Sequence, residues 1–262
     1  MRRSVEAAAL RVKAAWGRFV PGMQRAMSTA RLLIVQTGST SLHGDYPRWF
    51  EHALGFEMPV VRAHAGEKLG PSLDRLRPQG IIVTGSPLSV VDQATWMEDL
   101  GEDLLRVGAQ GTPVLGVCFG HQLLARAAGG AVVVNPRGRE IGTVRVQLSE
   151  AGRKDPLFAW ARQANEIEVQ ATHLDAVDPL PPEAVVLASN ENSAAQAFRL
   201  SETVAAVQFH PELWAQALRD LIVSRREKIA AEGQDPDALA ARVHEVDAGK
   251  ILQAFAAQAR GG

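Results

Sequence analysis

Residues 113–122 read Pro-Val-Leu-Gly-Val-Cys-Phe-Gly-His-Gln. Residues 113–117 form a short, continuous apolar run, which is typical of a strand buried on both faces of a sheet. A helical pattern begins at His121, so Cys118 lies at a sharp strand-to-helix turn. At such a turn a side chain projects above the sheet from a strained backbone. The segment therefore predicts an α/β fold with a thiol at the carboxyl end of a buried strand.

Further strands and helices alternate on the N-terminal side of this turn. Apolar runs bounded by turn residues predict strands at residues 31–36, 59–63 and 80–84, in addition to 113–117. Helical patterns occupy residues 46–54, 71–76, 95–108 and 121–128. Short apolar strands that alternate with helices indicate an open, mostly parallel sheet with helices on both faces.

The second half of the chain has a different pattern. Closely spaced strand candidates occur at residues 131–134, 142–148, 167–172, 184–188, 194–200 and 204–209. They predict either an antiparallel extension of the same sheet or a strand-rich flap. After Pro211 the pattern is helical to the end, with breaks near residues 233–236 and 247–249. No repeat or low-complexity linker divides the sequence, so residues 31–262 are expected to form a single domain with C-terminal helices.

The composition of the 262 residues is that of an ordinary soluble globular protein, with 46% apolar and 22% charged residues. A formal net charge of -1 gives no reason to expect a nucleic-acid partner. No apolar run approaches the roughly 18 to 20 residues that a membrane span needs. The single cysteine cannot form an internal disulfide, which fits a reducing cytoplasm.

Residues 1–30 carry several Arg and Lys side chains but only one acidic residue, Glu6. Three interpretations are open: an arm outside the core that precedes a core start at Met27, a helix docked on the domain or on a second subunit, and an organelle transit peptide. A secretory signal is not expected, because no continuous apolar core follows the arginines. We expect an N-terminal basic extension, either helical or disordered.

Cys118 has the surroundings of a reactive thiol. Gly116 and Gly120 keep the turn free of Cβ atoms that would crowd it. The start of the helix directs unpaired N–H groups and positive potential at the sulfur, which favours the thiolate. The N–H of Phe119 is placed to help stabilise an oxyanion. The alternative for these residues is a buried, inert cysteine flanked by packing glycines.

A candidate base follows the last predicted strand, in the tripeptide His210-Pro211-Glu212. In a Cys–His site the imidazole takes the thiol proton and later returns it to the leaving amine. An acceptor at the other ring nitrogen must hold one tautomer, and Glu212 can curl back past the proline to supply it. The alternative is a strand-to-helix turn in which Glu212 favours the N-terminal end of the new helix.

Together these segments resemble the class I (triad) glutamine amidotransferase family, whose elbow reads G-x-C-x-G-x-Q and whose second signature ends in H-P-E. Gly85-Ser86-Pro87 takes the place of the family's oxyanion loop, and residues 171–175 resemble the Ser-His-Gly-Asp stretch of GMP synthase glutaminase domains. The resemblance covers roughly residues 31–212. It implies the flavodoxin-like fold of that family, with the nucleophile at the carboxyl ends of the strands.

The resemblance also implies catalytic roles. Cys118 is expected to attack the side-chain amide of glutamine or of a related γ-glutamyl compound and to form a γ-glutamyl thioester. His210 is expected to be the base and Glu212 the carboxylate that orients it. Neither a metal nor an organic cofactor is expected.

Further residues are expected to bind the substrate. The resemblance places the N–H groups of Ser86 and Phe119 in the oxyanion hole, and Gly85 and Gln122 in the glutamine pocket. Ser86 departs from the family pattern, because the synthetase domains usually have glycine there, and this change can alter which γ-glutamyl compound fits. His173 is expected to order a loop or contact a partner rather than to act in catalysis.

The sequence contains neither a G-x-x-x-x-G-K-[ST] phosphate loop nor a Ser-Gly-Gly-x-Asp-Ser loop. We therefore expect a free-standing, GMP-synthase-like member of the family. The alternative is a glutaminase subunit that passes ammonia to a synthetase partner or another acceptor. The apolar content of the C-terminal helices also allows a homo-oligomer.

Three functions stay open from the sequence: a glutamine amidotransferase or amidohydrolase, a γ-glutamyl peptidase with the same triad, and a non-catalytic regulatory or binding protein on the same scaffold. Cys118, His210, Glu212 and Gln122 are all present, which favours an enzyme.

Overall fold

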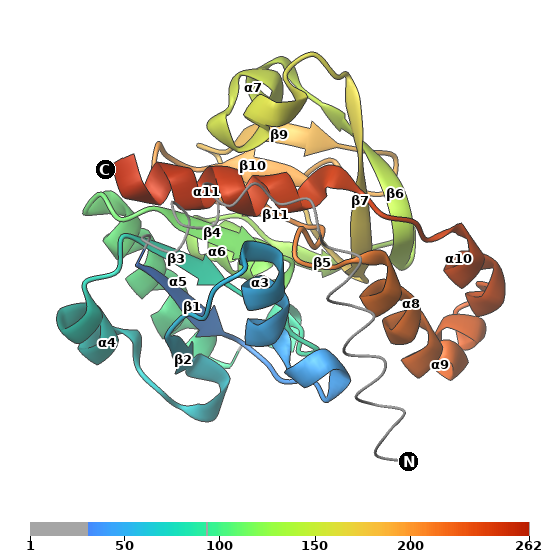
Figure 1. Ribbon diagram of the computed structural model, residues 1–262, viewed down its shortest axis with the longest axis horizontal. Coiled ribbons are helices and arrows are strands. Elements are labelled where there is room, and N and C mark those ends of the chain that lie inside the picture. Colours follow the sequence, from blue (N-terminus) through green and yellow to red (C-terminus); the bar gives the residue numbers. More distant parts are fainter. Residues whose placement is uncertain (1–30, 93, 262) are drawn as a thin grey trace.

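The computed structural model describes residues 31–92 and 94–261, so the expectations for residues 1–30 lie outside the described part. Its centre is a nine-stranded sheet with the strand order β2-β1-β3-β4-β11-β10-β9-β6-β7 (Figure 1). In chain order these strands are β1 (Leu32–Gln36), β2 (Val60–Arg62), β3 (Gly80–Val83), β4 (Val114–Val117), β6 (Glu140–Leu148), β7 (Glu166–His173), β9 (Val185–Ser189), β10 (Ala197–Arg199) and β11 (Val204–Val207).

One half of the sheet is parallel and the other half antiparallel. The neighbours β2-β1, β1-β3, β3-β4 and β4-β11 are parallel, whereas β10, β9, β6 and β7 continue the sheet in antiparallel pairs. This confirms the predicted α/β fold with an antiparallel extension. The pairing of β11 with β4 brings residues near 118 and 208 to the same sheet edge, because the carboxyl ends of parallel strands meet there.

One predicted strand does not join the extension. β5 (Val132–Val134) pairs instead with β8 (Asp175–Val177) in a separate two-stranded sheet, and β8 was not predicted at all. Val134 is 59% exposed, so β5 lies outside the layered core. The strand β8 is only three residues long and pairs with a segment some forty residues away, which leaves too little local periodicity to detect.

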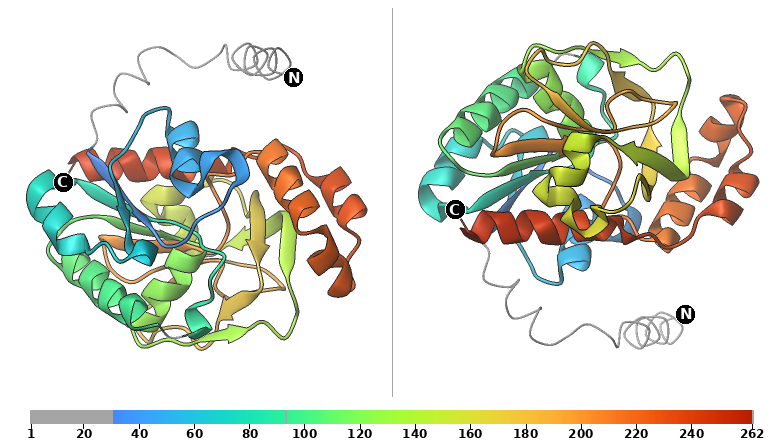
Figure 2. Two further views of the ribbon diagram at one scale, coloured as in Figure 1. Left: turned by 90° about the horizontal axis from the view of Figure 1, so that it is seen from below. Right: turned by 90° about the horizontal axis from the view of Figure 1, so that it is seen from above.

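Helices cover both faces of the main sheet (Figure 2). On one face α4 (Leu69–Leu76), α5 (Thr95–Ala109) and α6 (Phe119–Ala127) pack against the alternate strand residues that include Leu33 and Val35. On the other face α3 (Tyr46–Leu54), the 3-10 helix η4 (Pro156–Ala161) and α11 (Lys250–Gly261) pack against the residues that include Leu32 and Ile34. The period of two along β1 thus divides the core into two layers.

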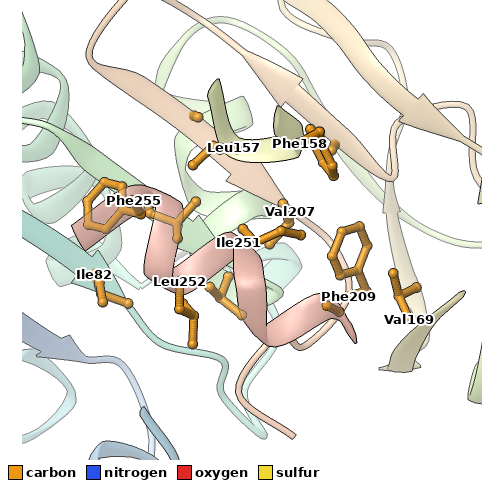
Figure 3. Close-up of a cluster of buried hydrophobic side chains, with 14 of the residues drawn as sticks. Ile82, Leu157, Phe158, Val169, Val207, Phe209, Ile251, Leu252 and Phe255 are labelled. Atoms are coloured by element: carbon orange, nitrogen blue, oxygen red, sulfur yellow. The ribbon is translucent and has the colours of Figure 1, made fainter. Parts of the chain in front are cut away.

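The C-terminal helix seals the second layer. Ile251, Leu252 and Phe255 of α11 are almost fully buried and lie in one cluster with Phe158 and Phe209 (Figure 3). Burying each such side chain stabilises the fold by about 1.5 to 3 kcal/mol. Phe209 directly precedes His210, so this packing also fixes the segment that follows β11.

A group of short helices stands at the end of the sheet beside β6 and β7 (Figure 1). These are α8 (Ala215–Ser224), α9 (Arg226–Ala231) and α10 (Pro236–Arg242), while α7 (Glu150–Lys154) packs near β9. A third apolar cluster joins α8 to Tyr46, Trp49 and Ile141, and therefore ties α3 to the C-terminal helices. In the described part of the chain, no helix is long and apolar enough to cross a membrane.

Candidate active site

Cys118 lies at the turn between β4 and α6 in a left-handed backbone conformation, with φ 52° and ψ -97°. A non-glycine residue held in such a region costs on the order of 1 to 3 kcal/mol. The surroundings enforce the turn, since the Cys118 N–H donates to the Val207 carbonyl at 2.9 Å. A Cβ on Gly116 would lie only 2.5 Å from the Gly120 carbonyl oxygen, so this glycine permits the close approach of strand and helix.

His210 and Glu212 lie beside this turn, as the two sequence signatures predict. The Nδ1 of His210 is 2.7 Å from Oε1 of Glu212, and both side chains are buried. The His210 N–H donates to the Gln170 carbonyl at 2.8 Å, which fixes the backbone from which the ring extends. The other ring nitrogen, Nε2, is buried and has no hydrogen-bonding partner in the described part of the chain. Nε2 is therefore free to exchange a proton with a reacting group.

The charges around His210 favour its protonated form. Burial acts to lower the pKa of His210, but the negative charges of Glu212 and Cys118 outweigh burial and raise the pKa to about 10. The ring thus lies close enough to Cys118 for a negative charge there to favour the imidazolium. A thiolate beside an imidazolium is the resting form that nucleophilic catalysis by cysteine requires.

The loop after β3 brings Gly85 and Ser86 to the same place. A Cβ on Gly85 would lie 2.9 Å from Cε1 of His210 and 3.6 Å from Cβ of Cys118. The Ser86 hydroxyl donates to the Thr37 carbonyl at 2.9 Å and accepts from the Leu88 N–H at 3.1 Å. These bonds anchor the loop through the side chain of Ser86 and leave its backbone N–H for another acceptor.

Phe119 and Gln122 extend the site along α6. As the first residue of α6, Phe119 has an N–H without an intrahelical acceptor. The Gln122 amide donates to the Asp175 carbonyl and to Oε1 of Gln208, both at 3.1 Å. Asp175 in turn accepts a hydrogen bond of 2.6 Å from the Ser89 hydroxyl. The Gln122 end of the site is therefore a polar wall that is held together from four separate segments.

A cavity of about 410 Å³ connects these groups. The predicted residues on its wall are Ser86, Cys118, Phe119, Gln122 and His210. Glu212 stands behind His210 rather than on the wall, because its side chain is fully buried.

The cavity wall also includes residues that sequence reasoning missed, namely Tyr46, Arg139, Thr172, Arg225 and Lys228. Tyr46 and Thr172 lie on α3 and β7, and Arg139 directly precedes β6. Arg225 lies between α8 and α9, and Lys228 is on α9. Thr172 belongs to the stretch at residues 171–175 that resembles the family, but no role was predicted for it. No sequence signal could have found Tyr46, Arg225 and Lys228, because cationic side chains near helix ends and an aromatic residue on an amphipathic helix are ordinary features.

Two other histidines near the site are held by the fold. His173 donates through Nδ1 to the Asp175 carbonyl at 3.1 Å, and its Nε2 lies 2.9 Å from Oε2 of the buried Glu140. His121 is fully buried against Phe198, with ring centroids 4.6 Å apart. Over residues 31–92 and 94–261, no group of three or more His, Cys, Asp or Glu side chains is placed to hold a metal ion.

Comparisons with known proteins agree with this architecture. Residues 52–226 match the family model of Glutamine amidotransferase class-I. A Saccharomyces cerevisiae protein whose name assigns it provisionally to the glutamine amidotransferases is 31% identical over 176 residues, which cover 64% of this chain and 68% of that protein. A solved structure of a glutamine amido transferase from Methylobacillus flagellatus has a TM-score of 0.69 at 24% identity, covering 89% of this chain and 95% of that one.

The chain therefore belongs to the class I glutamine amidotransferase family. A glutamine-hydrolyzing GMP synthase of Aeropyrum pernix is also similar, at 33% identity over 191 residues. That match covers 73% of this chain but only 34% of the synthase, so the chain spans about a third of this relative.

Proposed function

We propose that the protein hydrolyses or transfers the γ-amide of glutamine, or of a related γ-glutamyl compound, through a thioester on Cys118. One observation carries the proposal: Cys118 occupies a strained strand-to-helix turn beside His210, whose far nitrogen lies 2.7 Å from Glu212. This is the order of groups that a nucleophile, its base and the base's orienting carboxylate require.

The reaction then proceeds in two steps. The Cys118 thiolate attacks the amide carbon, and the oxyanion accepts hydrogen bonds from the N–H groups of Ser86 and Phe119. His210 gives its Nε2 proton to the departing nitrogen as the C–N bond breaks, which leaves the γ-glutamyl thioester. Water or an acceptor amine attacks the thioester, His210 takes the proton from the attacking group, and the thiolate leaves.

The polar wall at Gln122 is assigned to the glutamyl part of the substrate. Gln122 and the backbone at Gly85 would contact it, with Asp175 nearby. In this role the Gln122 amide would exchange one of its two internal hydrogen bonds for the ligand. The same acyl-enzyme serves a glutaminase and a γ-glutamyl peptidase, so this wall does not separate the two.

The fate of the ammonia is a further part of the proposal. The Aeropyrum pernix relative is named as a GMP synthase, so a synthetase partner that consumes ammonia is one candidate for this chain. A free-standing enzyme that passes the γ-glutamyl group to water is the other, and it is the one we favour. A cytoplasmic location agrees with a catalytic thiol that must stay reduced.

The test is ammonia release from glutamine by the purified protein beside the Cys118→Ala variant. We expect release by the wild type and none above background by the variant, together with a trapped γ-glutamyl hydroxamate when hydroxylamine is added. Equal release by both proteins would remove Cys118 from the reaction and refute the proposal.

A further inference from the structure

One end of the cavity carries positive charge that the proposed reaction does not use. Arg139, Arg225 and Lys228 lie on its wall together with Tyr46. Arg139 is neutralised, because its guanidinium donates to both carboxylate oxygens of Glu232 at 2.6 and 2.9 Å. Lys228 is exposed and lies at the outer part of this group.

Arg225 has no such counterion. Its guanidinium donates to the Thr172 hydroxyl at 2.8 Å, and in the described part of the chain no carboxylate lies within ion-pair distance of it. Burial lowers the pKa of Arg225, and the charge of Arg139 adds to this shift, whereas the charges of Tyr46, Cys118 and Glu232 oppose it. A guanidinium nevertheless stays charged in proteins. A half-buried cation that is not paired with a carboxylate is stabilised by a bound anion.

The position of Arg225 relative to Cys118 indicates which part of a substrate it meets. Arg225 and His210 are both held by β7: the His210 N–H donates to the Gln170 carbonyl, and the Arg225 guanidinium donates to the hydroxyl of Thr172, two residues farther along that strand. Tyr46 lines the same cavity as Arg225, His210 and Cys118. Glu212 is the partner of His210, which protonates the departing nitrogen. Because Arg225 is held two residues from the strand position that fixes His210, it can meet a leaving group that His210 protonates, whereas Gln122 extends from α6.

We propose that Arg225, with Tyr46 and Lys228 beside it, binds a carboxylate on the leaving group, so that the preferred substrates are γ-glutamyl amides of amino acids. A guanidinium matches a carboxylate with two parallel N–H donors, which makes it the favoured cation for this anion. The Tyr46 hydroxyl supplies a further donor. The inference rests on the proposed Cys118 chemistry and names its substrate class.

The reaction balances without a co-reactant other than water. The bond from the Cys118 sulfur to the γ-carbonyl carbon forms, and the bond from that carbon to the amino acid nitrogen breaks. His210 supplies the proton with which the amino acid leaves as a neutral amine, its carboxylate still paired with Arg225. Water then releases glutamate from the thioester.

The experiment compares γ-glutamylglycine with γ-glutamylmethylamide, which has the same scissile bond but no carboxylate on the leaving group. For the wild type we expect kcat/KM to be at least about tenfold higher with γ-glutamylglycine, as expected for a charged hydrogen bond. Arg225→Met should lower that value at least about tenfold and change the methylamide value less than about threefold. Arg225→Lys should recover part of the loss, and Arg62→Met, which removes an exposed Arg outside the cavity, should change neither value.

Several results would overturn the inference. One is a wild type that does not prefer γ-glutamylglycine, and another is an Arg225→Met variant that loses both substrates equally, which would place Arg225 at the glutamyl end or in folding. Calorimetry with the inactive Cys118→Ala variant measures the binding of both compounds independently of catalysis. Cys118→Ala must bind γ-glutamylglycine more tightly than γ-glutamylmethylamide, and the double variant Cys118→Ala/Arg225→Met must bind the two equally. If the wild type hydrolyses glutamine and γ-glutamylmethylamide but does not prefer γ-glutamylglycine, only this inference is refuted. If the wild type hydrolyses none of these amides, the proposed function is refuted.

Discussion

The Nδ1 atom of His210 and the Oε1 atom of Glu212 lie 2.7 Å apart, although the two residues are separated along the chain only by Pro211. The Glu212 carboxylate is fully buried, and its other oxygen has no partner in the described part of the chain. The carboxylate thus directs its one strong hydrogen bond to the ring. This geometry holds Nε2 of His210 towards Cys118 in a single orientation.

The Glu212→Gln variant tests whether Glu212 orients the His210 ring or only packs against it. The amide has nearly the same volume, but its NH₂ group can favour the wrong imidazole tautomer. We expect kcat to fall on the order of 10² to 10⁴-fold, as for other catalytic histidines that lose their carboxylate. The fold should persist, as far-ultraviolet circular dichroism would show. Glu57→Gln, at an exposed carboxylate far from the cavity, serves as the control, and a variant that retains most of its activity would argue against the orienting role.

Gly85→Ala should impair activity more than stability. The new Cβ would lie 2.9 Å from Cε1 of His210, and the ring cannot yield without weakening its bond to Glu212. A displacement of this kind can cost about 10²-fold in rate, while overpacking costs about 1 to 3 kcal/mol of stability.

The control for this variant is Gly70→Ala on α4. No atom lies within 4 Å of the position where its Cβ would be. Because alanine is the better helix former, this variant should keep its kcat and gain about 0.5 to 1 kcal/mol in the free energy of unfolding. Steady-state kinetics and urea denaturation of both variants check the pair, and a fully active Gly85→Ala enzyme would contradict the close packing.

His121 should make the protein sensitive to acid. Burial, together with the charge of His173, lowers the pKa of His121 to about 3. An unfolded histidine has a pKa of about 6.5, so between about pH 6.5 and 3 the unfolded chain binds the additional proton. The contribution of His121 to stability is therefore complete above pH 6.5 and is lost as the pH falls.

The His121→Met variant tests this pH dependence. Methionine is apolar and adaptable in packing, and it does not titrate. We expect the free energy of unfolding of the wild type to fall more steeply below pH 6.5 than that of the variant, by up to about 1.4 kcal/mol per pH unit. Urea denaturation from pH 7.5 to 4.5 measures both curves. Parallel curves would mean that His121 is not the source of the acid sensitivity.

Much of the fold follows from local sequence patterns. The helix predicted at residues 46–54 has those bounds in the structure, because Asp45 accepts a hydrogen bond from the Tyr46 N–H at its start and Gly55 adopts a left-handed conformation at its end. The strand predicted at residues 113–117 is confirmed as β4, since a continuous apolar run needs cover on both faces. The separation of β5 and β8 from the main sheet was not predictable, because it depends on which distant segments pair.

The sequence by itself determined the α/β fold, the family, and the residues expected to form the triad. These features depend on short segments in which backbone conformation, glycine positions and polar side chains are coupled within a few residues. Tertiary structure decided which side chains these three residues face. Tyr46, Thr172 and Arg225 come together only when α3 and α8 pack on the end of the sheet through one apolar cluster. The direction in which a helix side chain points is set by that packing, and no local pattern encodes it.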